Sequence, residues 1–259
     1  MKFFFLKQNL FLILCKEIYF LYLLTHLYNK ARSNYCRALL LFRSFYQLVL
    51  KNIFSYLIKK FSLFSNFIVH KPFNVLSQFS SQDGKKTLKD FFDVPMEVYP
   101  VGRLDYDSEG LLILTDDKKL NKYLLDPLHN HEREYWVQVE GVITPAAINQ
   151  LQNGVTINVN GKSYHTKKCK AEIFLQPPVV SERFPPIRFR KFIPDSWIKI
   201  FLTEGKNRQV RKMTASIGHP TLRLIRYRIG KISLEGLLPG EMKKITTQEL
   251  YNLLQIHKR

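Results

Sequence analysis

The chain has 259 residues, and its 46% hydrophobic content is sufficient for a packed core in one or two domains. Its 40 Lys and Arg against 21 Asp and Glu give a formal net charge of +19, which favours a polyanionic partner, nucleic acid or an anionic membrane surface, over acidic small molecules alone. Three cysteines lie far apart without a CxxC pair, which argues against a disulfide framework or a zinc site and favours a reducing compartment.

Residues 1–66 form a segment with its own composition, rich in Phe, Leu and Tyr and with Glu17 as its single acidic residue. No small-residue cleavage site follows the apolar start, and charged residues interrupt it before it reaches the roughly 18 residues of a membrane span. We therefore expect an N-terminal extension outside the main fold, with an organelle transit peptide or a membrane-surface helix as alternatives. Residues 67–259 remain net basic without it and should form the folded domain.

Several strands are expected downstream, because apolar and polar residues alternate with the period of a half-buried strand. These alternating segments lie around residues 135–139, 198–202 and 225–229. The last of them would place Arg226 and Arg228 on one face of a sheet. The apolar run 111–114 also favours a strand.

Helices are expected to be fewer. Residues 207–217 carry apolar side chains at helical spacing and end at Gly218, which is typical of a helix C-cap. Near the C-terminus, Thr246 and Glu249 have the spacing of a capping box in front of several leucines. The dominance of strands with interspersed helices predicts an α+β fold built on an antiparallel sheet.

The most informative motif is the stretch VGRLDYDSEGLLILTD at residues 101–116. Its Gly-Arg-Leu-Asp turn brings the carboxylate of Asp105 near the guanidinium of Arg103. A carboxylate beside a cation stays ionised at neutral pH, as a nucleophile or a base must be. Asp105 could equally cap a turn, which is the ordinary use of Asp beside Gly and Ser.

Two other functions compete for the same acidic residues. Their spacing matches an EF-hand loop, with carboxylates at 105, 107, 109 and 116. However, Pro100 and Gly102 exclude a preceding helix, and position 12 holds Asp instead of the usual Glu, so we expect no metal site. A hydrolase with two carboxylates is also disfavoured, because neighbours along one turn do not straddle a bond at the ~5–10 Å separation such pairs use.

A second motif, Glu204-Gly205-Lys206-Asn207-Arg208-Gln209-Val210-Arg211-Lys212-Met213, is strongly cationic. It is one of three basic clusters that would bind phosphates with an affinity that falls with salt. A solvated charged face would explain any one cluster, but not all three on a basic domain. The clusters are Arg183, Arg188, Arg190 and Lys191; Arg208, Arg211 and Lys212; and Arg223, Arg226 and Arg228.

Together these two motifs resemble the RsuA-type family of ribosomal RNA pseudouridine synthases. The resemblance runs from about Val69 to Leu250 and is strongest to a branch that modifies the large ribosomal subunit and lacks the S4-type RNA-binding domain. The segments that match this branch are residues 70–79, 185–191, 218–224 and 238–241. The resemblance implies a bent, mostly antiparallel central sheet with flanking helices and a cleft across it.

The resemblance also implies the chemistry, which is the isomerisation of a flipped-out uridine to pseudouridine without a cofactor or a metal. Asp105 would be the catalytic residue, either attacking ribose C1′ or removing the C2′ proton. Lys206 would pair with Asp105, Arg103 would support the site or bind a phosphate, and Tyr135 would stack on the target base. Tyr135 could instead be an ordinary core residue of its strand.

The expected partner is large-subunit ribosomal RNA, bound by a monomer that needs no small-molecule cofactor. The expected location is the cytoplasm, or an organelle if residues 1–66 include a transit peptide. The alternative to an enzyme is a non-catalytic RNA-binding protein of the ribosome. Such a protein would keep the basic clusters but would not require Asp105.

Overall fold

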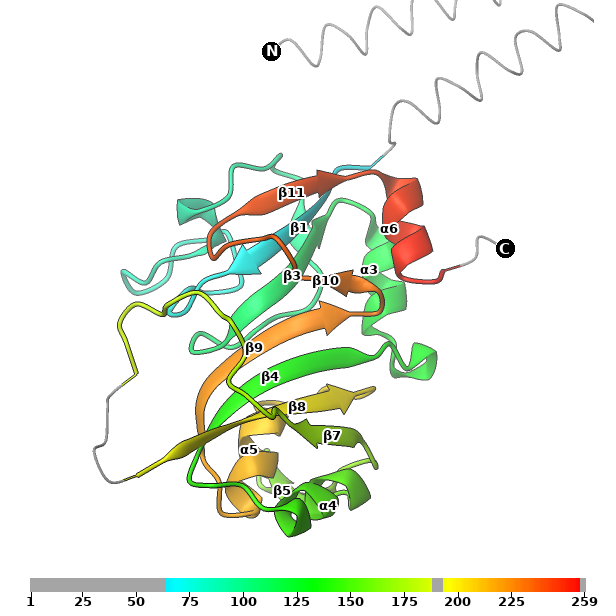
Figure 1. The fold of residues 1–259 in the computed structure, drawn as a ribbon. Coiled ribbons are helices and arrows are strands. Elements are labelled where there is room, and N and C mark those ends of the chain that lie inside the picture. Colours follow the sequence, from blue (N-terminus) through cyan, green and yellow to red (C-terminus); the bar gives the residue numbers. More distant parts are fainter. Residues whose placement is uncertain (1–63, 188–192, 257–259) are drawn as a thin grey trace, which may run out of the picture. The chain divides into compact units, whose positions relative to one another are not determined.

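A computed structural model describes residues 64–187 and 193–256 of the chain (Figure 1). The described residues all lie within one compact unit, Phe61–Arg259. Within them, no helix has the length and apolar character needed to cross a membrane. Three of the expected RNA-binding residues, Arg188, Arg190 and Lys191, lie outside the described residues.

A long, bent sheet forms the centre of the fold, as expected for the α+β class (Figure 1). Neighbouring strands are antiparallel except at the pair β3–β9. Two short strands pair with members of this sheet, β2 (Tyr99–Pro100) with β3 and β10 (Ile232–Ser233) with β9. A separate hairpin consists of β5 (Thr156–Val159) and β6 (Lys162–His165). The main strand order is β11 (Met242–Ile245), β1 (Asn66–Lys71), β3 (Glu109–Thr115), β9 (Thr221–Ile229), β4 (Arg133–Glu140), β8 (Asp195–Leu202) and β7 (Lys170–Ile173).

Short helices flank this sheet and begin at capping residues. The side chain of Asp117 accepts hydrogen bonds at the start of α3, and Thr144 does the same for α4. Thr246 accepts a bond from the Glu249 amide, which confirms the predicted cap, and Gly218 follows the end of α5 at φ 81°. The helices of the described part are α3 (Lys118–Leu125), α4 (Pro145–Asn153), α5 (Gln209–Ser216) and α6 (Thr247–Leu253), with 3₁₀ turns η1 (Leu88–Asp90) and η2 (Pro127–His129).

Strand β3 is buried on both faces, which anchors the Gly-Arg-Leu-Asp turn that precedes it. All seven of its residues are buried. Leu111 and Ile113 pack into one apolar cluster with α3 and α6, while Leu112 and Leu114 pack into another with β1 and η1. A further cluster in the described part joins β4 and β8 to α4 and α5. The burial of several large side chains makes β3 a rigid base for the turn.

The first strand begins at the last residue of the expected N-terminal extension. Asn66 is fully buried, and its side-chain oxygen accepts a hydrogen bond of 2.6 Å from Thr115. Its amide group donates to Thr247 at 3.0 Å. Asn66 therefore connects β1 with β3 and α6, and belongs structurally to the sheet.

The two halves of the sheet meet at the short parallel pairing of β3 with β9. Only two residue pairs form it within the described residues, Glu109 with Ile225 and Gly110 with Arg226. Gly110 has a φ of 117°, and a Cβ atom there would lie 2.4 Å from the Arg226 carbonyl oxygen. Glycine is therefore required for both its conformation and the close approach of the strands.

Replacing Gly110 by Ala should destabilise the fold by at least about 2 kcal/mol, because the strands must separate to admit the methyl group. Urea unfolding would measure this change. Gly218→Ala is the matched control, because Gly218 also has a positive φ but has open space around it. The control should lose only the backbone contribution of about 1 kcal/mol. Equal losses in the two variants would contradict the steric explanation.

Candidate active site

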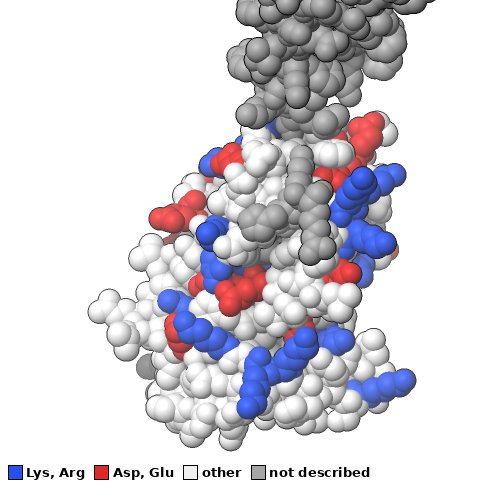
Figure 2. Space-filling view, turned by 90° about the vertical axis from the view of Figure 1, so that its right-hand side faces the viewer, with Lys and Arg blue, Asp and Glu red and all other residues white. Residues whose placement is uncertain are grey.

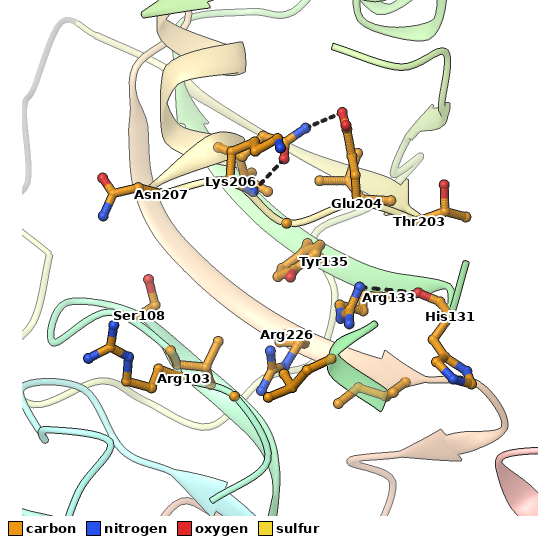
Figure 3. A pocket seen from close by; sticks show the side chains of 18 of the residues that line it. Arg103, Ser108, His131, Arg133, Tyr135, Thr203, Glu204, Lys206, Asn207 and Arg226 are labelled. Carbon is orange, nitrogen blue, oxygen red and sulfur yellow. Dashed lines mark hydrogen bonds between the residues drawn. The ribbon is translucent and has the colours of Figure 1, made fainter. Parts of the chain in front are cut away.

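A cavity of about 510 Å³ lies between the Gly-Arg-Leu-Asp turn and the loop that connects β8 to α5. Asp105, Arg103, Tyr135 and Lys206, the four site residues expected from the sequence, all line it. Figure 3 shows Arg103 on one side of this cavity and Lys206 on the opposite side, with Tyr135 between them. The fold thus brings together side chains that are about a hundred residues apart in the sequence.

The backbone around Asp105 is fixed by a buried serine. The Ser77 hydroxyl donates to the Leu104 carbonyl oxygen at 2.7 Å, and its oxygen accepts from the Leu104 amide at 3.0 Å. The Ser108 amide closes the turn with a bond to the Asp105 carbonyl oxygen at 3.0 Å. The Asp105 side chain is 34% exposed and therefore accessible from the cavity.

The cation nearest to Asp105 is Arg208, which corrects two expectations from the sequence. Arg208 Nη1 lies 3.8 Å from Asp105 Oδ2. Within the described residues, neither Arg103 nor Lys206 forms an ion pair with Asp105. Arg103 is exposed, and the Lys206 ammonium lies 4.9 Å from the centre of the Tyr164 ring. Although Arg103 is only two residues from Asp105 in the sequence, its guanidinium group does not pair with the Asp105 carboxylate.

Asp107 connects the Gly-Arg-Leu-Asp turn to the start of α5. It accepts two hydrogen bonds of 2.8 Å from Arg208, and its backbone carbonyl accepts one of 2.6 Å from Arg211. Partial burial opposes ionisation of Asp107, but the bonds from Arg208 and the charge of Arg211 outweigh it and lower the pKa of its carboxyl group. Arg208 adopts a left-handed conformation, with φ 52°, immediately before the helix.

The loop that carries Lys206 is organised by the buried carboxylate of Glu204. This carboxylate accepts hydrogen bonds from the Tyr164 hydroxyl, from the Lys167 amide at 3.0 Å and from the Gln209 amide group at 2.6 Å. Gln209 in turn accepts a bond from the Lys206 backbone at 2.9 Å. The bond to Glu204 raises the pKa of Tyr164 to about 12. Sequence reasoning missed this network because its members come from separate elements.

Tyr135 and Arg226 face each other on neighbouring strands between the two walls of the cavity (Figure 3). Tyr135 is half-buried, so one part of its ring remains available to a ligand. Arg226 is buried and donates from Nε to the Leu111 carbonyl oxygen at 2.8 Å. Arg226 lines the cavity, so its expected contact with RNA is limited to a group that enters the cavity.

The other arginines of β9 are also used inside the protein. Arg223 is buried and makes bonds of 2.9 and 2.7 Å to Glu109. Arg228 makes bonds of 2.7 Å to both Glu134 and Glu132. These pairs hold β9 to its neighbours, so the third basic cluster is not a free cationic face. Figure 2 shows one face of the molecule, on which acidic side chains lie among the Lys and Arg side chains.

The acidic run after Asp105 does not form an EF-hand. Residues 109–115 are strand β3, as the apolar run predicted, and Glu109 is engaged by Arg223. Asp107 is engaged by Arg208. The described residues contain no group of three or more His, Cys, Asp or Glu arranged to hold a metal ion.

Lys71, at the end of β1, is a charged group that sequence reasoning missed. It is fully buried and donates from Nζ to the carbonyl oxygens of Pro72 and Val75 at 2.9 and 2.8 Å. Burial lowers the pKa of Lys71 to about 7, although the nearby carboxylates of Glu109, Asp107 and Asp105 act in the opposite direction. The only sequence signal was a lysine two residues after the apolar run Phe67–Val69.

The fold and the sequence are similar to those of known pseudouridine synthases. The structure is similar to a solved pseudouridylate synthase, with a TM-score of 0.59 and 27% identity over 74% of this chain and 75% of that one. The family model for RNA pseudouridylate synthase matches residues 66–216. The chain therefore belongs to the RNA pseudouridylate synthase family and is an enzyme of that class.

Two relatives refine the assignment, and both are named ribosomal large subunit pseudouridine synthase E. The protein of Vibrio vulnificus is 49% identical over 69% of this chain and 74% of its own length. That of Xanthomonas axonopodis pv. citri is 47% identical over 66% of this chain and 89% of its own. These similarities confirm the predicted RsuA-type membership.

The buried Lys71 should make stability depend on pH. Its pKa of about 7 in the folded state lies below the ordinary 10.5, so the unfolded chain binds more protons between these two values and stability rises with pH. From pH 7 to pH 9 this group should add about 2 kcal/mol to the free energy of unfolding.

Lys71→Met should remove this contribution, while Lys244→Met on exposed β11 should keep the wild-type slope. Chemical denaturation at several pH values would measure the free energy of unfolding of each protein. Parallel pH profiles for wild type and Lys71→Met would contradict the assignment.

Proposed function

We propose that this enzyme converts a specific uridine of large-subunit ribosomal RNA to pseudouridine. The observation that carries the proposal is the cavity that joins Asp105 to Tyr135 and Lys206 in a chain 49% identical to a named large-subunit enzyme. The formal charge of +19 supports a polyanionic substrate. Ribosomal RNA as the proposed substrate also supports the expected location of the enzyme in the cytoplasm. We further propose that the enzyme acts as a monomer without a cofactor.

Asp105 is the proposed catalytic residue. The reaction breaks the bond between uracil N1 and ribose C1′, turns the base, and forms a new bond from C5 to C1′. C5 loses its proton and N1 gains one, so no atoms are added or removed overall. The proposed chemistry needs a carboxylate and a pocket that retains the detached base. Asp105 either attacks C1′ to form an ester that the turned base displaces, or takes the C2′ proton and later returns it. Both routes need the Asp105 carboxylate at the cavity. Ser77 supports this position by fixing the backbone of the preceding residue, Leu104.

The target base must leave its RNA stack to reach Asp105. Flipping a nucleotide out of its stack requires a few kcal/mol, and an aromatic ring in the pocket restores part of that energy. Tyr135 is the proposed ring, because it is half-buried in the cavity and faced by Arg226. The volume of about 510 Å³ lies within the range of pockets that bind small ligands.

Several cations are proposed to bind the phosphates around the flipped nucleotide. Arg103 is exposed at one wall of the cavity, and Lys206 lines the opposite wall. Arg208, Arg211 and Lys212 continue that wall along α5, although Arg208 and Arg211 also bind Asp107. Arg188, Arg190 and Lys191 remain proposed contacts from their sequence pattern. Such contacts give an affinity that falls steeply with salt.

The variant Asp105→Asn should lose at least about a thousandfold in rate, because an amide can neither attack C1′ nor remove a proton. Pseudouridine would be mapped at every position of ribosomal RNA incubated with each protein, and RNA binding would be measured by gel shift. Binding should stay within about twofold of wild type, because the folded cavity and its cations are retained.

Asp83→Asn is the matched control, since Asp83 lies exposed in a turn at φ 50°, a conformation that Asn also adopts. This control should retain full activity. An active Asp105→Asn enzyme would remove Asp105 from the chemistry, whereas loss of the modification with the control as well would indicate a folding defect.

A further inference from the structure

The last residue of α3 and the turn that follows it present apolar side chains to solvent in a fixed geometry. Leu125 is 51% exposed and Leu128 is 82% exposed. Asp126 organises the turn, because its carboxylate accepts a bond from the Leu128 amide at 2.9 Å and its own amide donates to the Lys122 carbonyl at 3.1 Å. Single exposed leucines are common, but two on a tightly capped turn beside an active-site cavity indicate a binding surface.

Aromatic rings pack around this turn. The rings of Tyr123 and His129 are stacked, with centres 3.6 Å apart and an angle of 25° between their planes. His131 lies 5.2 Å from Tyr123. Burial and the charge of Arg133 lower the pKa of His131, so this ring is neutral near pH 7. We name the combined surface of Tyr123, Leu125, Leu128, His129 and His131 the stacking platform.

The stacking platform is continuous with the active-site cavity. Leu125, Asp126, Pro127 and His131 are part of the cavity lining. In Figure 3, His131 lies at the end of the cavity opposite Arg103. A strand of RNA with its target nucleotide between Asp105 and Tyr135 would therefore pass over this surface.

Charge beside the stacking platform favours RNA over an apolar partner. The exposed side of α3 carries three lysines within a turn and a half. Unpaired RNA bases are recognised by stacking on aromatic side chains, while cations bind their phosphates. The exposed lysines of α3 are Lys118, Lys119 and Lys122.

We propose that the stacking platform binds the base of an unpaired nucleotide adjacent to the flipped uridine. This inference rests on the proposed function, because it assigns a contact to the same RNA. The base lies on the His129 ring with Leu128 at its edge, and the α3 lysines bind the phosphates that lead away from the cavity. The platform thereby holds the strand while the target nucleotide is out of its stack.

Leu128→Ser and His129→Ala test the proposal in the full-length chain. Both changes are made in the Asp105→Asn background for binding and in the active enzyme for kinetics. Each should weaken binding to a transcribed large-subunit ribosomal RNA about tenfold, the effect of losing one stacked base, and should raise KM with kcat within about twofold.

Val142→Ser is the matched control, because Val142 is 68% exposed and follows the opposite end of β4. The eight residues of that strand separate it from His131 by roughly 25 Å. Its RNA affinity should equal that of the parent. RNA affinities of Leu128→Ser and His129→Ala that match this control would overturn the proposal.

Inorganic polyphosphate, which has phosphates without bases, separates stacking from charge. Competition by polyphosphate should be unchanged in Leu128→Ser and His129→Ala, and an equal loss for polyphosphate and RNA would also overturn the proposal. Failure of the proposed function is distinguishable, because it would appear as modification by Asp105→Asn or as RNA without pseudouridine. The binding comparison does not depend on catalysis.

Discussion

The active site depends on the link that two arginines of the β8–α5 region make to Asp107. Arg208 grips the Asp107 carboxylate with two bonds of 2.8 Å, and Arg211 holds its backbone carbonyl at 2.6 Å. An ion pair exposed to this extent adds little to overall stability. Its importance is geometric, because it joins the turn that carries Asp105 to the loop that carries Lys206. The link adds a direct contact between the two walls of the cavity to the connection that the sheet provides.

Several charged side chains are buried below the cavity. The buried Arg223–Glu109 pair lies where β3 meets β9, and Arg226 is buried beside it. Breaking a buried pair leaves an uncompensated charge at a loss of about 3–5 kcal/mol, so such pairs restrict which strand registers are possible. Arg226 and Lys71 have no carboxylate partner among the described residues. Arg226 donates to the Leu111 carbonyl oxygen, and Lys71, whose pKa falls to about 7, donates to two carbonyl oxygens. Some of the basic side chains that give the sequence its positive charge are therefore buried inside the fold and do not lie on its surface.

Periodicity predicted much of the fold but little of the charge geometry. The strands at 135–139, 198–202 and 225–229 and the helix from Gln209 to Ser216 follow patterns that depend only on local spacing. The residues that line the cavity could be predicted from the family motifs, because each motif identifies the sequence positions of the site residues. The ion pair between Asp105 and Arg208 could not be predicted, because it depends on the left-handed backbone of Arg208, which directs the side chain to the Gly-Arg-Leu-Asp turn. The Glu204 network also requires Tyr164, from a hairpin that no local pattern connects to the loop.

The two walls of the cavity rest on different apolar cores. Val101, just before the turn, belongs to the cluster around α3 and α6, whereas Val210 and Met213 of α5 belong to the cluster around α4. The two cores share β8 and β9, since Trp197 and Ile225 belong to the first and Ile198 and Leu224 to the second. Substitutions deep in either core can therefore alter the width of the site without touching a substrate. Variation should be tolerated most easily when it stays within one core, and least along β8 and β9, where the two cores share strands.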